Sequence, residues 1–126
     1  MITPEGLRYS RDHEWVRVEG DRAVIGITDY AQDALGDVVY VDLPQSGDEL
    51  AAGASFGEVE STKSVSELYA PVSGTVSSVN DDLADGPDKV NTDPYGDGWV
   101  CAVVLADPSE LDGLLDAAAY RALIED

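Results

Sequence analysis

The feature that most constrains the fold is how often turn-forming residues interrupt the apolar segments of the chain. Between Trp15 and Leu105 the stretches rich in Val, Ile and aromatic residues are short, and Gly, Pro, Asp or Asn follows each of them closely. Such stretches are typical of β-strands joined by tight turns and are too short for the helices of a bundle. The sequence therefore predicts a mainly β protein with short helices at its edges.

The first two expected strands flank Gly20-Asp21, a pair that favours a two-residue hairpin turn. The strands expected from the whole pattern are residues 15–19, 22–27 and 38–43, two strands between residues 55 and 70 that meet near Lys63, a strand after Pro71, and residues 99–105. The last of these is the most apolar, so we expect it in the centre of a sheet. Residues 80–98, rich in Asp, Asn, Gly and Pro, are expected to form a long loop.

Three short helices are expected beside the strands. Asp29 is expected to cap the first, with Gln32 reaching back to it, and Gly36 is expected to end it. Asp107 and Asp116 are expected to cap two further short helices near the C-terminus.

A chain of 126 residues has room for one modest core, so we expect a single domain over residues 1–126 with no separate catalytic domain. No apolar run approaches the roughly 20 residues that a membrane-spanning helix needs. The N-terminal stretch also lacks the basic and apolar parts of a signal peptide. We therefore expect a soluble, cytoplasmic protein.

Acidic residues outnumber basic ones by 26 to 7, which gives a net charge of −19. Such a surface repels nucleic acid and anionic membranes, so neither is an expected partner. The surface also repels itself, and the Debye length over which it does so falls from about 10 Å at 0.1 M salt to about 3 Å at 1 M. With lysine nearly absent, this pattern resembles proteins of salt-accumulating, halophilic cells; an ordinary acidic carrier protein is the alternative.

Several patterns that resemble catalytic or metal sites lack residues that their chemistry needs. Residues 53–57 match a Gly-x-Ser-x-Gly nucleophile elbow, but a strand is expected after them and the only histidine, His13, comes earlier. The acidic loop 81–97 lacks the ligand spacing of a calcium loop, which leaves open only weak binding of ions. One cysteine with one histidine does not favour zinc. His13 is expected to pack or hydrogen-bond rather than transfer protons with Glu14, and Cys101 to be buried and inert.

Lys63 is one of only two lysines and stands at the expected tip of a hairpin. A hairpin tip presents a side chain rigidly and openly, which suits a lysine that is modified by one enzyme and visited by others. From the tip alone, an ordinary surface lysine would be the better interpretation. However, Gly47 and Gly74, sixteen residues before and eleven residues after Lys63, are expected to be turn glycines that bracket the hairpin. This spacing resembles lipoyl and biotinyl domains, and Thr62 and Ser64 stand where biotin carriers have methionine, so lipoate is favoured.

The resemblance extends over nearly the whole chain. It is carried by residues 9–16, 25–32, 35–44, 57–66, 70–74, 90–91, 94–95 and 98–99. These segments resemble, in order, the H protein of the glycine cleavage system. The departures are mild: Thr62 and Ser64 stand where this family usually has valine and alanine, and some members have histidine at the position of Ala34.

The resemblance implies a flattened barrel-sandwich hybrid of two antiparallel sheets with short peripheral helices and a C-terminal helical segment. It implies a carrier rather than an enzyme, with lipoate attached covalently to Lys63. The carrier would take the aminomethyl group of glycine from glycine decarboxylase (P protein) to aminomethyltransferase (T protein), and dihydrolipoamide dehydrogenase (L protein) would reoxidise it. The cofactor and the partner enzymes supply the chemistry, whereas the protein presents and shields the arm.

The same resemblance implies the roles of further residues. Glu14, Ile27, Leu35 and Glu67 are expected to line the cleft in which the arm docks, and Glu60 is expected to be recognised by the lipoate-attachment enzyme. One alternative is a lipoyl relay protein for lipoate biosynthesis or another redox complex. Another is an acidic scaffold whose lysine is never modified.

Overall fold

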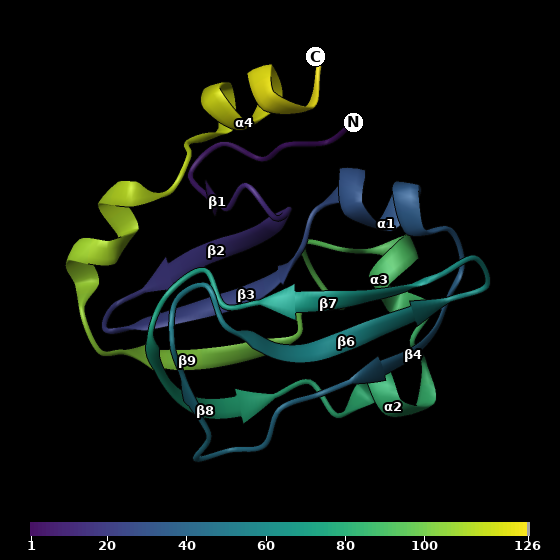
Figure 1. The fold of residues 1–126 in the computed structure, drawn as a ribbon, viewed down its shortest axis with the longest axis horizontal. Helices are drawn as coiled ribbons and strands as arrows, with labels where there is room; N and C mark the ends of the chain where they lie inside the picture. The colour runs from purple at the N-terminus through teal and green to yellow at the C-terminus, as the bar shows by residue number, and fades with distance from the viewer. Residues whose placement is uncertain (126) are drawn as a thin grey trace.

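Two antiparallel sheets form the body of the protein (Figure 1). The computed structural model describes residues 1–125. Its larger sheet has the strand order β1-β2-β3-β9-β8-β5 and its smaller sheet the order β4-β6-β7. The strands are β1 (Arg8–Tyr9), β2 (Glu14–Glu19), β3 (Arg22–Ile27), β4 (Val38–Asp42), β5 (Glu49–Leu50), β6 (Ser55–Ser61), β7 (Val65–Tyr69), β8 (Gly74–Val79) and β9 (Cys101–Leu105). The predicted mainly β fold of two antiparallel sheets is confirmed, and the described strands do not close into a barrel.

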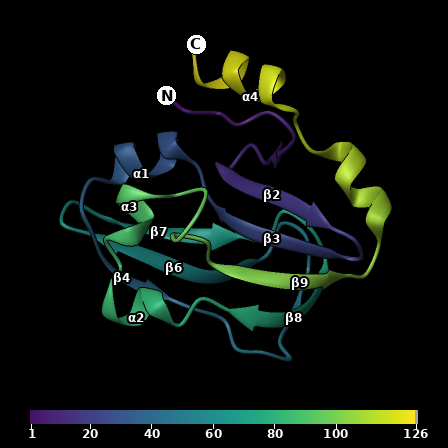
Figure 2. The ribbon, with the colours of Figure 1, turned by 180° about the vertical axis from the view of Figure 1, so that it is seen from behind.

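The strands pair as the turn residues predict. Strands β2 and β3 form the expected hairpin around Gly20, whose φ of 67° lies in the left-handed region that favours glycine. Strand β9 pairs with β3 on one side and β8 on the other, which confirms the central position predicted for this apolar segment (Figure 2).

Both faces of the central strands are buried. Val16, Ile25 and Val103 face the smaller sheet and pack in the main core. Trp15 and Val24, their neighbours in sequence, point to the opposite face and pack in a second cluster, to which the C-terminal helix α4 (Ala117–Ile124) contributes Ala117 and Tyr120. Fully burying one such aliphatic side chain contributes about 1.5–3 kcal/mol. Burial on both faces explains why these strands are apolar runs rather than alternating patterns.

Helix α1 (Asp29–Leu35) begins one residue earlier than predicted. Thr28 is the N-cap, because its hydroxyl accepts a hydrogen bond from the Ala31 N–H at 3.1 Å. The prediction of Asp29 as the cap is therefore wrong. Asp29 lies in the first turn, where a carboxylate suits the helix dipole, and it accepts a hydrogen bond from Gln32 at 2.8 Å. Gly36 ends the helix as predicted, with a φ of 81°.

Two further predictions are wrong, one about residues 80–98 and one about Gly74. Residues 80–98 are not one open loop: they contain the one-turn helices α2 (Asp82–Asp85) and α3 (Lys89–Thr92), because Leu83 and Val90 are buried in the core and anchor them. Gly74 is not a turn glycine. It begins β8, where a Cβ would collide with the carbonyl oxygen of Val104. Gly47, in contrast, is a turn glycine with a φ of 94°.

The C-terminal segment follows the prediction. A 3₁₀ helix, η1 (Pro108–Gly113), is capped by the Asp107 carboxylate, which accepts a hydrogen bond from the Ser109 N–H. Asp116 caps α4 in the same way through the Ala119 N–H at 2.8 Å. Helix α4 lies beside the N-terminal segment and on the same side of the molecule as α1 (Figures 1 and 2).

Candidate functional site

The hairpin between β6 and β7 holds Lys63 at an ordered tip. The hydroxyl of Ser61 accepts hydrogen bonds from the N–H groups of Lys63 at 3.2 Å and Ser64 at 3.1 Å, and it donates one to the Ser64 carbonyl at 3.1 Å. These local bonds fix a turn whose residues remain exposed. The structure thus places Lys63 at an exposed hairpin tip, as the sequence predicts.

The tip also rests against the end of helix α1. The Thr62 N–H donates a hydrogen bond to the Asp37 carbonyl at 3.0 Å. The φ of 81° favours glycine at position 36, and a Cβ there would lie 3.2 Å from Cε of Lys63. The Lys63 side chain therefore lies across the C-terminal end of α1, next to which the hairpin tip is seen in Figure 1.

A pocket of about 330 Å³ opens between α1, the hairpin and the start of β2. It is lined by Asp12, His13, Glu14, Ile27, Tyr30, Ala31, Ala34, Leu35, Val59, Ser64, Val65, Ser66, Glu67 and Leu68. The four residues expected to line a cleft, Glu14, Ile27, Leu35 and Glu67, are all brought together here. Because Ser64 and Val65 follow Lys63 directly in the chain, the pocket begins beside the lysine.

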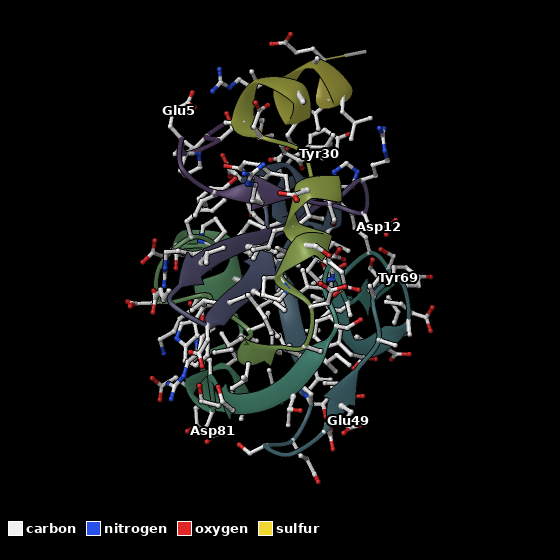
Figure 3. All side chains as sticks on the ribbon, turned by 90° about the vertical axis from the view of Figure 1, so that its left-hand side faces the viewer. Glu5, Asp12, Tyr30, Glu49, Tyr69 and Asp81 are labelled. Carbon is white, nitrogen blue, oxygen red and sulfur yellow. The ribbon has the colours of Figure 1, made fainter. Side chains whose placement is uncertain are left out.

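Other lining residues were not predicted. Tyr30 and Ala31 lie four and three residues before Ala34, the lining position at which some family members have histidine, so helical periodicity could have identified them. Asp12 and His13 lie in the turn before β2, and no sequence pattern places such a turn at the pocket. Figure 3 labels Tyr30 just below helix α4 and Asp12 lower, at the right-hand side of the molecule.

Glu14 is the most unusual group in the pocket, because its side chain is only 2% exposed. Its carboxylate accepts hydrogen bonds from the Ser10 hydroxyl at 2.6 Å and from the Tyr69 N–H at 3.2 Å, so it joins the larger sheet to the end of β7. Burial raises the pKa of the Glu14 carboxyl to about 7, and the Ser10 and Tyr69 hydrogen bonds only partly oppose this. The group is therefore poised to change charge near neutral pH.

The lining combines an apolar wall with acidic groups. Ile27, Leu35 and Leu68 supply apolar surface, whereas Asp12, Glu14 and Glu67 supply carboxyl groups, and no Lys or Arg is among the lining residues. Such a pocket suits a long apolar group that ends in an amine. Its lining includes Ser64, the residue after Lys63, so the residues present fit an arm attached to Lys63.

Glu60 lies outside this pocket. It is on the central strand of the smaller sheet, opposite Tyr40 on β4 and Val65 on β7, and is partly exposed. It precedes Lys63 by three residues, so a protein that contacts the tip can also contact Glu60.

Residues that suggested other chemistry are placed elsewhere. Cys101 is buried, and burial raises the pKa of its thiol to about 12, which fits the inert cysteine predicted. Ser55 begins β6, a strand, as expected for a false nucleophile elbow. Within residues 1–125 no group of three or more His, Cys, Asp or Glu side chains is arranged to hold a metal ion. In the same residues no helix is long and apolar enough to cross a membrane.

An exposed lysine on an ordered hairpin, beside a pocket that can shelter an attached arm, defines a small carrier protein. The glycine cleavage H-protein family matches residues 7–126. The glycine cleavage system H protein of Anaeromyxobacter sp. (strain K) is 56% identical over 126 residues, covering 100% of this chain and 98% of the relative. The probable glycine cleavage system H protein of Haloarcula marismortui is 60% identical over 122 residues, covering 97% and 96%.

The solved structures agree. The crystal structure of a glycine cleavage system H protein from Mycobacterium marinum matches with a TM-score of 0.89 and 43% identity, covering 98% of this chain and 99% of the other. The chain belongs to the glycine cleavage H-protein family. It is thus a carrier of the glycine cleavage system and not itself a catalyst, in a family whose members bear lipoate on a lysine. Membership implies the P, T and L proteins of the system as partners.

Proposed function

We propose that Nζ of Lys63 carries the lipoyl group, and that the protein acts as a single domain over residues 1–126. The observation that supports this most is the position of Lys63, at an ordered, exposed tip directly beside the pocket. When bound, the lipoyl group supplies the disulfide that accepts the aminomethyl group of glycine from the P protein. The T protein removes this cargo and the L protein restores the disulfide.

Attachment requires an accessible lysine amine. The neutral Nζ attacks the carboxyl carbon of an activated lipoyl group and forms an amide bond as the bond to the activating group breaks. One of the two Nζ protons passes to solvent and the other stays on the amide. Because Lys63 is exposed, an attachment enzyme can approach it directly. We propose that this enzyme also recognises Glu60, which shares the hairpin but takes no part in the pocket.

Docking follows from the chemistry of the pocket. The apolar side chains of Ile27 and Leu35 contact the hydrocarbon part of an arm attached to Lys63. Glu14 and Glu67 receive the amine that the cargo adds to its end, and an ionised carboxylate accepts charge-assisted hydrogen bonds from an ammonium group. The walls of the pocket exclude water, so the cargo is protected from hydrolysis while the protein moves between enzymes.

The surface fits the remaining proposals. Exposed acidic side chains lie at well-separated places on the outline of the molecule, among them the labelled Glu5, Glu49 and Asp81 (Figure 3). With a net charge of −19, we propose neither nucleic acid nor a membrane as a partner. We also propose a cytoplasmic protein adapted to high salt, on the basis of this charge.

The experiment is a map of the modification site. Protein co-expressed with its attachment enzyme should gain the mass of one lipoyl group, and peptide mapping should place it on Lys63. Lys63→Arg keeps the positive charge but cannot form the neutral amide, so it should fold and remain unmodified. Lys89→Arg, which changes the only other lysine, is the matched control and should be modified normally. Lipoylation of Lys89 in the unaltered protein would refute the proposal.

A further inference from the structure

The C-terminal helix reaches the arm pocket through one tyrosine. Tyr120 of α4 is fully buried, and its hydroxyl lies 2.8 Å from Nδ1 of His13 and 2.7 Å from the hydroxyl of Thr28. His13 lines the pocket, and Thr28 caps α1, the helix that forms one wall of it. The Tyr120 hydroxyl therefore contacts two parts of the pocket wall, the turn that carries His13 and the start of helix α1.

The direction of these hydrogen bonds follows from counting donors and acceptors. The buried Thr28 hydroxyl accepts a bond from the Ala31 N–H, and its own hydrogen has only the Tyr120 oxygen as a partner among the described residues. Thr28 therefore donates to Tyr120. The Tyr120 hydrogen then goes to Nδ1 of His13, because among residues 1–125 the only other group within hydrogen-bond distance is the Thr28 hydroxyl, which already donates to Tyr120.

This order fixes the state of the histidine. An Nδ1 that accepts a hydrogen bond carries no hydrogen, so His13 is neutral and bears its single hydrogen on Nε2. Burial favours the same state, since it lowers the pKa of His13, although Asp12 opposes the effect, and burial raises the pKa of Tyr120 to about 12, which keeps its hydroxyl protonated.

The backbone holds His13 in place as well. Its backbone φ of 73° lies in the left-handed region, which residues other than glycine rarely adopt. The turn is secured because the His13 carbonyl accepts a hydrogen bond from the Thr28 N–H at 3.0 Å. The imidazole packs against Tyr30, with ring centroids 4.8 Å apart, and meets the edge of the Tyr120 ring. The imidazole is thus held on several sides.

We propose that Tyr120 is a positioning residue of the arm pocket, whose hydroxyl keeps His13 neutral with hydrogen on Nε2 and secures the cap of helix α1. This inference rests on the function proposed above. Tyr30 and Tyr120 pack against the imidazole, and Asp12, Glu14 and Glu67 line the same pocket. An imidazolium in this pocket would attract these carboxylates and repel an amine. A neutral His13 leaves the carboxylates free for the amine of the cargo.

The first test needs no cofactor, because His13 is the only histidine and its nitrogen resonances are unambiguous in NMR. In unmodified wild-type protein at pH 8 we expect the Nε2–H form alone. In Tyr120→Phe we expect a mixture of the two neutral forms and a pKa that moves up toward the ordinary value of about 6.5.

Tyr9→Phe is the matched control. Its ring stacks on Tyr120 with centroids 4.6 Å apart, and its hydroxyl donates to the Pro4 carbonyl at 2.7 Å, without contact with His13. This variant loses a buried tyrosine hydroxyl from the same cluster but no hydrogen bond to His13 or Thr28, so the His13 spectrum should stay unchanged.

The second test uses lipoylated protein loaded with the aminomethyl group. The aminomethyl group on the Tyr120→Phe protein should be lost by hydrolysis about two- to tenfold faster than that on the Tyr9→Phe protein. This factor corresponds to the free energy of one hydrogen bond. An altered His13 with equal lifetimes would overturn the assigned role toward the cargo.

Two results would overturn the inference without any loaded protein. The first is an Nδ1–H form of His13 in the wild type, a result that does not depend on whether Tyr120→Phe folds. The second is a folded Tyr120→Phe protein in which the tautomer and the pKa of His13 are unchanged. Failure of the proposed function looks different: the protein would not be lipoylated on Lys63, while the NMR results for Tyr120 would be as expected.

Discussion

Replacing Glu14 by Gln should stabilise the protein at alkaline pH. The carboxyl of Glu14 has an ordinary pKa near 4.5, and burial raises it to about 7 in the folded protein. Between these values the folded protein binds the proton that the unfolded chain has released, so its stability falls as pH rises through this window. Below pH 4.5 the group is protonated in both states and costs nothing.

The size of the effect follows from the same shift. At pH 8 the ionised carboxylate costs the fold about 3 kcal/mol, and at pH 5 less than about 1 kcal/mol. Glutamine mimics the protonated carboxyl: its oxygen accepts from the Tyr69 N–H, and its amide donates to the Ser10 hydroxyl oxygen, at the positions that Glu14 occupies. The substitution therefore removes the charge, keeps the bond from the Tyr69 N–H and reverses the direction of the bond with Ser10.

Urea unfolding at pH 5 and pH 8, at one fixed salt concentration, measures the prediction. Glu14→Gln should be more stable than the wild type by about 3 kcal/mol at pH 8 and by less than about 1 kcal/mol at pH 5. The comparison cancels the pH dependence of the other acidic groups, which both proteins share. A difference that is equal at the two pH values would refute the buried, ionising carboxylate. The gain in stability should be accompanied by a shorter lifetime of the loaded arm, since a carboxylate that receives the amine is lost.

Three further predictions follow from the hairpin, the charge and the pocket. Glu60→Ala should slow lipoylation with little change in melting temperature, whereas Glu58→Ala, two residues farther from the tip on the same strand, should not; equal rates would leave Glu60 without a role in recognition. Melting temperature should rise steadily from low salt to molar KCl because salt screens the repulsion of 26 acidic residues, and a flat profile would argue against adaptation to salt. Leu35→Asp should shorten the lifetime of the loaded arm without preventing loading, because it puts a charge into the apolar wall, while Val39→Asp, at an exposed position of β4, should not; equal lifetimes would mean that the arm docks elsewhere.

Much of the fold could be predicted because local chemistry specifies it. The Gly20 turn, the end of α1 at Gly36 and the cap at Asp116 each depend on neighbours within four residues. The errors arise where distant contacts decide. Gly74 was expected in a turn, but its lack of a side chain serves a close approach to Val104, thirty residues away. Residues 80–98 were predicted to be a polar loop because Leu83 and Val90 are isolated apolar residues in the sequence. Their burial depends on the whole core, which the local sequence does not show.

The same limit applies to the pocket. Family resemblance suggested Glu14, Ile27, Leu35 and Glu67, and the structure brings all four together. His13 and Tyr120 are separated by 107 residues, and no periodicity or spacing links them. Only the packing of α4 on the larger sheet brings them within hydrogen-bond distance.

Loading from glycine tests the central claim most directly. Protein lipoylated on Lys63 is mixed with glycine and a matching P protein, and intact mass is followed together with released carbon dioxide. We expect one aminomethyl group per lipoyl group and one carbon dioxide for each group loaded, with no gain for unlipoylated Lys63→Arg. A lipoylated protein that the L protein reduces and reoxidises, but that never gains the aminomethyl group from glycine, would contradict the account and favour a relay protein instead.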